Sequence, residues 1–169
     1  MALKAEAQAF VDRYKLQKSR IDNFIIYKGE TILLIVSGIG VESCRVATQT
    51  LINHFDIEDD DIFVNIGVCG ADISYDIGEL IEIGAISYDE ILYVYDKDKK
   101  SIVCVDFAVD KTTYDIVDME SYGFYDAVIH NPAIKKFKIY KVVSDHFEPQ
   151  KVTKDFAKKL IADRLEEIF

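Results

Sequence analysis

The distribution of apolar and polar positions along the 169-residue chain predicts alternating helices and strands. Residues 3–16 have interspersed charges and the apolar spacing of an amphipathic helix. Two apolar runs, FIIYK (24–28) and TILLIVS (31–37), flank a short Gly-Glu turn and predict a hairpin. Residues 41–54 again have helical spacing. The first third of the chain therefore predicts helix, hairpin and helix in that order.

The rest of the chain predicts buried strands and further helices. The run IFVNIG (62–67) is almost uninterrupted in its apolar character, which is typical of a strand covered on both faces. More strands are predicted at 79–87, 91–95, 101–105 and 137–144, and more helices at 118–130 and 150–168. This alternation predicts an α/β fold with a central mixed sheet. Because we find no internal repeat or linker, we expect a single domain over residues 1–169.

Composition narrows the class of protein. Half of the residues are hydrophobic and only two are proline, as in a packed globule. The net charge of −10 argues against nucleic-acid binding, since a phosphate backbone would repel the protein. The sequence has neither an 18-residue apolar run nor the core of a signal peptide, so we predict no membrane span. Three cysteines without CxxC spacing favour reduced thiols and a cytoplasmic location.

Strand ends are the candidate ligand-binding segments, because ligands in α/β sheets bind beyond the carboxyl ends of strands. SGIGVES (37–43) has two glycines that let a ligand approach the backbone, but Ser43 replaces the third glycine of a dinucleotide fingerprint. A tight strand-to-helix turn explains this segment equally well. NIGVCGAD (65–72) carries Gly67 and Gly70, which either make a turn or clear space for a ligand.

VVSDHFEP (142–149) places Ser144 and Asp145 at the end of an apolar strand. Asp145 is either the N-cap of the next helix or a carboxyl group that acts as a general acid in a cleft. His146 and Glu148 follow, but one histidine and two nearby carboxylates do not form a ligand set. We therefore predict no metal here.

A carboxylate shares a helix face with apolar positions in residues 118–130. Glu120, Gly123, Phe124 and Ala127 fall at i, i+3, i+4 and i+7 of a helix. Burying an unpaired charge is costly, and no cation lies nearby in the sequence. Glu120 therefore needs either a buried partner from elsewhere in the chain or a ligand, whereas Asp118 is a candidate N-cap of the helix.

These segments resemble, in this order, those of the nucleoside phosphorylase/nucleosidase family. This family includes purine and uridine phosphorylases and 5′-methylthioadenosine/S-adenosylhomocysteine nucleosidase. The matching stretches are SGIG (37–40), NIGVCGA (65–71), DIGELIEIG (76–84), VDMES (117–121) and VVSD (142–145). The resemblance implies a three-layer α/β/α fold of nucleoside phosphorylase type, a small-molecule nucleoside as ligand, no cofactor and a homodimer.

The resemblance also implies an activity, cleavage of the N-glycosidic bond of a nucleoside. Hydrolysis of a purine nucleoside to free base and sugar is our leading hypothesis. A phosphate-dependent phosphorylase and a non-catalytic nucleoside-binding protein are the alternatives. Arg45 is the only arginine near a glycine-rich strand end, which favours water over phosphate as the nucleophile.

Site residues follow from the same resemblance. Asp145 would protonate the leaving base, with Ser144 supporting it. Glu120 would accept hydrogen bonds from the ribose 2′- and 3′-hydroxyls, with Met119 packing beneath the sugar. Such a carboxylate also favours the positive charge that develops on the ribose.

The remaining implied roles concern the water and the base. In the nucleosidases of this family, a glutamate shortly after the first strand orients the attacking water. The alignment of ALKAE with that segment implies this role for Glu6. Backbone around Cys69 and Gly70 would line the pocket, and Phe107 would stack on the base.

The chain also departs from the family pattern. The family's first strand is expected to be missing, because Met1 lies where that strand should already have ended. The segment 90–116, which helps to form the family's base pocket, is shortened. Val68 stands where relatives have serine or threonine, and Lys141 replaces an arginine that often supports the acid.

Overall fold

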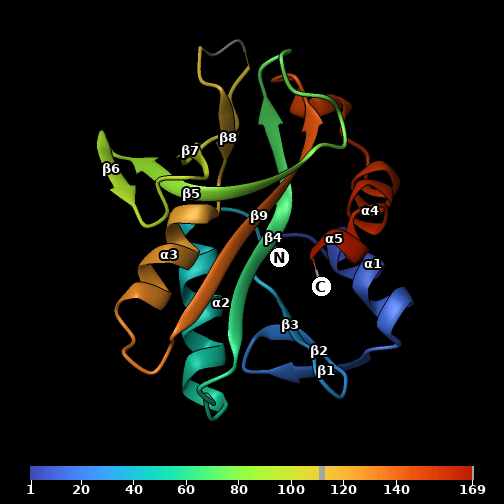
Figure 1. Cartoon of the computed structure of the whole chain (residues 1–169). Coiled ribbons are helices and arrows are strands. Elements are labelled where there is room, and N and C mark those ends of the chain that lie inside the picture. The colour runs from blue at the N-terminus through green and yellow to red at the C-terminus, as the bar shows by residue number, and fades with distance from the viewer. Residues whose placement is uncertain (111–112, 169) are drawn as a thin grey trace.

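The N-terminal part of the computed structural model is a helix followed by a small antiparallel sheet (Figure 1). The structure describes residues 1–110 and 113–168. The helix and sheet comprise α1 (Lys4–Tyr14), β1 (Gln17–Ile21), β2 (Phe24–Lys28) and β3 (Leu33–Val36). The predicted helix and hairpin are confirmed. Strand β1 was not predicted, because it is an exposed edge strand whose polar sequence has no apolar alternation.

Over the described ranges, the larger sheet has six strands and is mixed, as predicted. Its strands are β4 (Ile62–Ala71), β5 (Leu80–Tyr88), β6 (Ile91–Val94), β7 (Lys100–Cys104), β8 (Ile116–Asp118) and β9 (Lys136–Asp145). Their order is β6-β5-β7-β8-β4-β9, and β5 also pairs with β9, so five of the strands close into a ring. Pairing is parallel for β4–β9, β5–β7 and β7–β8, and antiparallel for the others.

Helices lie on both sides of β4 and β9, which gives the three layers of the predicted α/β fold (Figure 1). Helix α2 (Val41–His54) packs against α3 (Ser121–Ile129), and α1 packs against α4 (Lys154–Ala162). The short helices η1 (Pro149–Lys151) and α5 (Leu165–Ile168) flank α4. None of the helices in the described ranges is long and apolar enough to cross a membrane.

Two predicted helices differ from the structure. The single helix predicted at 150–168 is divided, because the Thr153 side chain accepts a hydrogen bond from Phe156 N and starts α4 anew. The helix predicted at 118–130 begins only at Ser121, since β8 occupies the residues before it.

Strands β4 and β9 carry the core on both faces. In β9, Ile139 and Val143 belong to the cluster beneath α2 and α3, whereas Tyr140 and Val142 belong to the cluster beneath α1 and α4. This alternation follows the two-residue period of a strand. Burial on both faces confirms the expectation from the IFVNIG run.

The first residues of the chain bond to the end of β3. Met1 N donates to Ile35 O, and Met1 O accepts from Ser37 N. Ala2 O accepts from Gly38 N, which fixes the glycine-rich turn before α2. Within the described residues, α1 is the first regular element, and no strand precedes it.

Candidate active site

Glu120 is buried at the start of α3, with only 8 % of its surface exposed. Its Oε1 accepts a hydrogen bond of 3.0 Å from Gly40 N, at the glycine turn before α2. Burial raises the pKa of Glu120, and the nearby Lys141 ammonium partly offsets this. Gly123, Phe124 and Ala127 are buried as well, so the predicted face is confirmed.

Lys141 supplies the cation that the sequence around Glu120 lacks. Its Nζ lies 2.7 Å from Asp118 Oδ2, and both side chains are almost fully buried. Burial alone would lower the pKa of Lys141, but the charges of Asp118 and Glu120 raise it above its usual value. The pair joins β9 to the end of β8, directly before Glu120.

Asp118 also organises the first turn of α3. Its Oδ2 accepts from the backbone N of Glu120 and of Ser121, at 3.2 and 2.9 Å. Ser121 Oγ donates to Asp118 Oδ1 at 2.6 Å. Asp118 lies at the end of β8 and Glu120 is the N-cap residue, so the N-cap position predicted for Asp118 is wrong, although its side chain does cap the helix.

Glu6 enters the same region from α1 and is 2 % exposed. Its Oε1 accepts from Val68 N at 3.1 Å, and its Oε2 accepts from Leu3 N at 2.8 Å. A Cβ on Gly67 would lie 3.2 Å from Glu6 Oε1 and 3.7 Å from Lys141 Nζ. The missing side chain of Gly67 therefore leaves room for both of these charged groups beside β4.

Asp145 is the last residue of β9, and its carboxylate is held on both oxygens. Ser144 Oγ lies 2.7 Å from Oδ2, and Glu148 N donates to Oδ1 at 2.7 Å. Ser144 Oγ also lies 3.1 Å from Cys69 O. Asp145 does not cap α4, because Thr153 does. The alternative role of Asp145 as a cap for that helix is therefore wrong.

Gly70 connects the two acidic groups. In β4, Gly70 pairs with Val117 of β8 on one side and with Asp145 of β9 on the other. The register shifts between Cys69 and Gly70, which skips Ser144 and places Asp145 opposite Gly70. Asp145 therefore lies on one strand that flanks Gly70, and Glu120 comes two residues after the end of the other, β8.

The remaining predicted residues divide into two groups. Cys69 and Ser144 are buried, Gly70 and Met119 are half-buried, and all four lie along or next to the strand ends described above. The structure does not bring Phe107 to them, since its side chain is 82 % exposed in the loop after β7. The neighbouring residues 111 and 112, within the shortened segment 90–116, lie outside the described residues.

The thiols and the histidine offer no competing chemistry. All three cysteines are free and buried, and burial raises the pKa of each thiol. His146 Nδ1 lies 3.0 Å from Ala71 O and so ties the loop after β9 to the end of β4. Among the described residues, no group of three or more His, Cys, Asp or Glu side chains could hold a metal.

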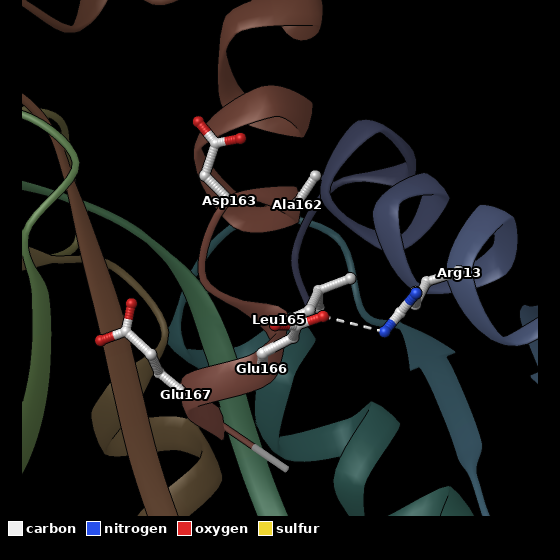
Figure 2. A pocket seen from close by; sticks show the side chains of 6 residues that line it. All are labelled: Arg13, Ala162, Asp163, Leu165, Glu166 and Glu167. Carbon is white, nitrogen blue, oxygen red and sulfur yellow. Dashed lines mark hydrogen bonds and ion pairs between the residues drawn. The ribbon is translucent and has the colours of Figure 1, made fainter.

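Two surface hollows differ in their relation to these acids. One, of about 270 Å³, is lined by Ile39, Gly40, Val41, Glu42, Ser43, Arg45, Tyr88 and Asp106. It is connected to one of the acids, because Gly40, which lines it, donates its backbone N–H to Glu120 Oε1. The other, of about 320 Å³, lies at α5, where Arg13 pairs with Glu166 (Figure 2). Among the described residues, none of the predicted site residues lines either hollow.

The arrangement combines two chemical functions at one sheet end. Asp145, with a hydroxyl beside it, can donate a proton to a ligand atom near Gly70. Glu6 and Glu120 add two further buried carboxylates, and the charge of Lys141 on β9 is already paired with Asp118. The two carboxylates can stabilise a cation or accept hydrogen bonds from hydroxyls. A ligand that becomes anionic at one end and cationic at the other would match both.

No protein-family model matches the sequence, and no curated protein matches it. Solved structures do match. The 5′-methylthioadenosine/S-adenosylhomocysteine nucleosidase of Neisseria meningitidis, in complex with methylthio-immucillin-A, superposes with a TM-score of 0.77 at 17 % identity, covering 99 % of this chain and 95 % of that one.

Two further structures agree. The 5′-methylthioadenosine/S-adenosylhomocysteine nucleosidase of S. pneumoniae, with a transition-state inhibitor, gives a TM-score of 0.77 at 15 % identity, with coverage of 99 % and 97 %. The futalosine hydrolase of Helicobacter pylori superposes with a TM-score of 0.73 at 13 % sequence identity. The match covers 98 % of this chain and 95 % of that one. The fold implied by the sequence resemblance is thus confirmed: this chain has the α/β fold of the 5′-methylthioadenosine/S-adenosylhomocysteine nucleosidases.

Proposed function

We propose that this protein hydrolyses the N-glycosidic bond of a purine nucleoside and releases the free base and the sugar. The observation that carries the proposal is that Asp145 of β9 pairs with Gly70, while Glu120, the N-cap residue of α3, comes just after β8, which pairs with Gly70 on its other side. The fold supports it, since structures of the same fold are nucleosidases and a futalosine hydrolase. The inhibitor complexes of those proteins favour a 5′-methylthioadenosine-like substrate.

Asp145 is the proposed general acid. As the bond breaks, negative charge develops on the base, and a proton donated to a ring nitrogen stabilises the leaving group. Ser144 Oγ, at 2.7 Å, and Glu148 N fix the orientation of the carboxyl group. A group held this way needs little reorganisation at the moment of proton transfer.

Glu120 is the proposed ribose ligand. Gly40 N is bonded to Oε1, and the carboxylate accepts hydrogen bonds from the sugar hydroxyls, with Met119 packing beneath the ring. The sugar acquires oxocarbenium character in the transition state, as in other glycoside hydrolyses. The negative charge of Glu120 stabilises that cation, which is a reason for burying a carboxylate here.

Glu6 is the proposed water-positioning residue. Its carboxylate is anchored by Val68 N and Leu3 N and lies beside Gly67 and Lys141. A carboxylate in this position can accept a proton from water as the water attacks the anomeric carbon. Residue 68 is a valine, which has no hydroxyl, so Glu6 is the proposed residue that positions the water.

Water is favoured over phosphate by the charges at the site. Arg45, which lines the hollow at Gly40, is paired with Glu42 at 2.7 Å and with Asp126 at 2.8 Å. The buried Lys141 is likewise paired with Asp118. With these cations neutralised and two further carboxylates present, a phosphate dianion would meet net repulsion.

We further propose a cytoplasmic homodimer. The free, buried thiols support a reducing compartment. The support for a dimer is an exposed apolar strand, since Ile91, Leu92 and Val94 of β6 are each more than half exposed. Light scattering coupled to gel filtration tests the dimer.

The function is tested by incubating the protein with 5′-methylthioadenosine in buffers with and without phosphate and measuring the released adenine by chromatography. We expect release at equal rates in both buffers. A rate that requires phosphate would identify a phosphorylase. Thermal stabilisation by the nucleoside without any release would identify the non-catalytic alternative.

A further inference from the structure

Phe147 lies beside the proposed acid. The three heavy atoms nearest to a Cβ built on Gly70 are Phe147 Cδ1 at 3.4 Å, Asp145 Oδ1 at 3.5 Å and Phe147 Cε1 at 3.8 Å. The ring edge and the carboxylate oxygen therefore border the same small space above β4. Because Gly70 has no side chain, the ring and the carboxylate can both lie close to the backbone of β4.

The loop holds Phe147 in place from both sides. Its backbone has a φ of 58°, the left-handed region that non-glycine residues rarely adopt. The preceding His146 is tied to Ala71 O at 3.0 Å, and the following Glu148 N is bonded to Asp145 Oδ1 at 2.7 Å. The acid itself thus fixes the turn that directs the aromatic ring.

Packing of the protein core does not account for this ring. Phe147 is half-buried, and it belongs to none of the three hydrophobic clusters that the described residues form. Residues in unfavourable backbone conformations cluster at ligand-binding sites. A ligand contact would therefore explain why a phenylalanine occupies this position outside the core.

We propose that Phe147 is the aromatic side chain that packs against the base and favours a purine. The proposal rests on the proposed function, because a base protonated by Asp145 must lie within hydrogen-bond reach of that carboxyl group, and hence beside this ring. A planar aromatic ring offers stacking area to a base. Phe107, which the sequence suggested for this role, is 82 % exposed in another loop.

Fluorescence provides a test that does not depend on turnover. The chain contains no tryptophan, so Phe147→Trp introduces a single indole. Titration with adenine is expected to quench its emission saturably. Phe107→Trp, a matched aromatic replacement in an exposed loop, is expected to show no saturable quenching. Quenching of the Phe107→Trp variant and not of Phe147→Trp would overturn the proposal.

Kinetics provide a second test, on the full-length protein. Phe147→Ala is expected to raise KM for 5′-methylthioadenosine by about five- to 100-fold, from the usual cost of losing one base–aromatic stack. Phe147→Tyr keeps the ring and is expected to restore KM to within about threefold of the wild type. Circular dichroism of both variants verifies that they fold.

The outcomes separate this inference from the function on which it rests. If the wild type releases base and Phe147→Ala does so with unchanged KM, the proposed role of Phe147 is refuted, whereas the proposed hydrolase activity is not. If the wild type neither releases base nor binds adenine, the proposed function fails, and the inference fails with it.

Discussion

Replacing Lys141 by methionine would remove the cation from a buried ion pair. The Lys141 Nζ lies 2.7 Å from Asp118 Oδ2, and the side chains are 1 % and 0 % exposed. Methionine retains much of the apolar stem, so the main loss is electrostatic. The Asp118 carboxylate would remain in the core with its hydrogen bonds to α3 but without a counter-charge.

The expected cost is large. Removing one partner of a buried pair typically destabilises by about 3–5 kcal/mol, because the other charge is left uncompensated. The three hydrogen bonds that Asp118 accepts from Glu120 and Ser121 place our expectation near the lower end of that range. At about 2–4 °C per kcal/mol for a domain of this size, a loss of about 3 kcal/mol would lower Tm by roughly 6–12 °C.

Urea unfolding followed by circular dichroism measures this change. Lys138→Met is the matched control on the same strand, since Lys138 Nζ lies 3.8 Å from Glu82 and its side chain is 47 % exposed. Such a surface pair should contribute less than about 1 kcal/mol. The double variant Lys141→Met/Asp118→Asn should recover part of the loss. Equal unfolding free energies for Lys141→Met and Lys138→Met would refute the reasoning.

Three further predictions concern the site and the fold. Burial raises the pKa of Glu120 above 4.5, so this carboxylate is protonated, and kcat/KM should fall, as the pH drops through that raised pKa. In a pH–rate profile, Glu120→Gln should abolish this fall. By linkage, the raised pKa of Glu120 contributes to the free energy of unfolding below pH 4.5. Urea titrations at increasing pH should show this contribution being lost as the pH rises through the pKa of Glu120 in the folded state. Glu6→Gln should lower kcat at least tenfold with little change in KM in steady-state assays; unchanged kcat would remove Glu6 from the mechanism. Gly123→Ala should destabilise by more than about 2 kcal/mol in urea, because its Cβ would lie 2.0 Å from Val41 O of α2; an unchanged midpoint would contradict this packing.

The elements that the sequence predicted are those with a strong apolar period. Helix α2 and strands β4 and β9 have long apolar patterns, and the structure confirms them. Strands β1 and β8 were missed for physical reasons. The residues of β1 are polar, and β8 has only three residues, fewer than a period can define.

The site was predictable only in part. The burial of Glu120 followed from its helix face, and the structure confirms it. Its relation to Lys141 was not predictable, because pairing with Asp118 depends on the register that brings β8 and β9 to the same strand. The register shift that places Asp145 opposite Gly70 has no signal in the apolar pattern.

The proposed aromatic contact illustrates the same limit. Order along the chain suggested Phe107, which follows an aspartate in the shortened segment 90–116. The ring beside Asp145 instead belongs to Phe147, where a left-handed backbone and two hydrogen-bonded neighbours direct it toward Gly70. Backbone strain of this kind depends on tertiary contacts, and local sequence does not report it.

The most direct test of the proposed mechanism is the initial rate of adenine release from 5′-methylthioadenosine by the wild type and by Asp145→Asn. Asparagine preserves the size of the side chain and can still accept the hydrogen bond from Glu148 N, but it cannot serve as the carboxylic acid. We predict a fall of about 10²- to 10⁴-fold, with circular dichroism and Tm unchanged. Equal rates for the two proteins would contradict the account.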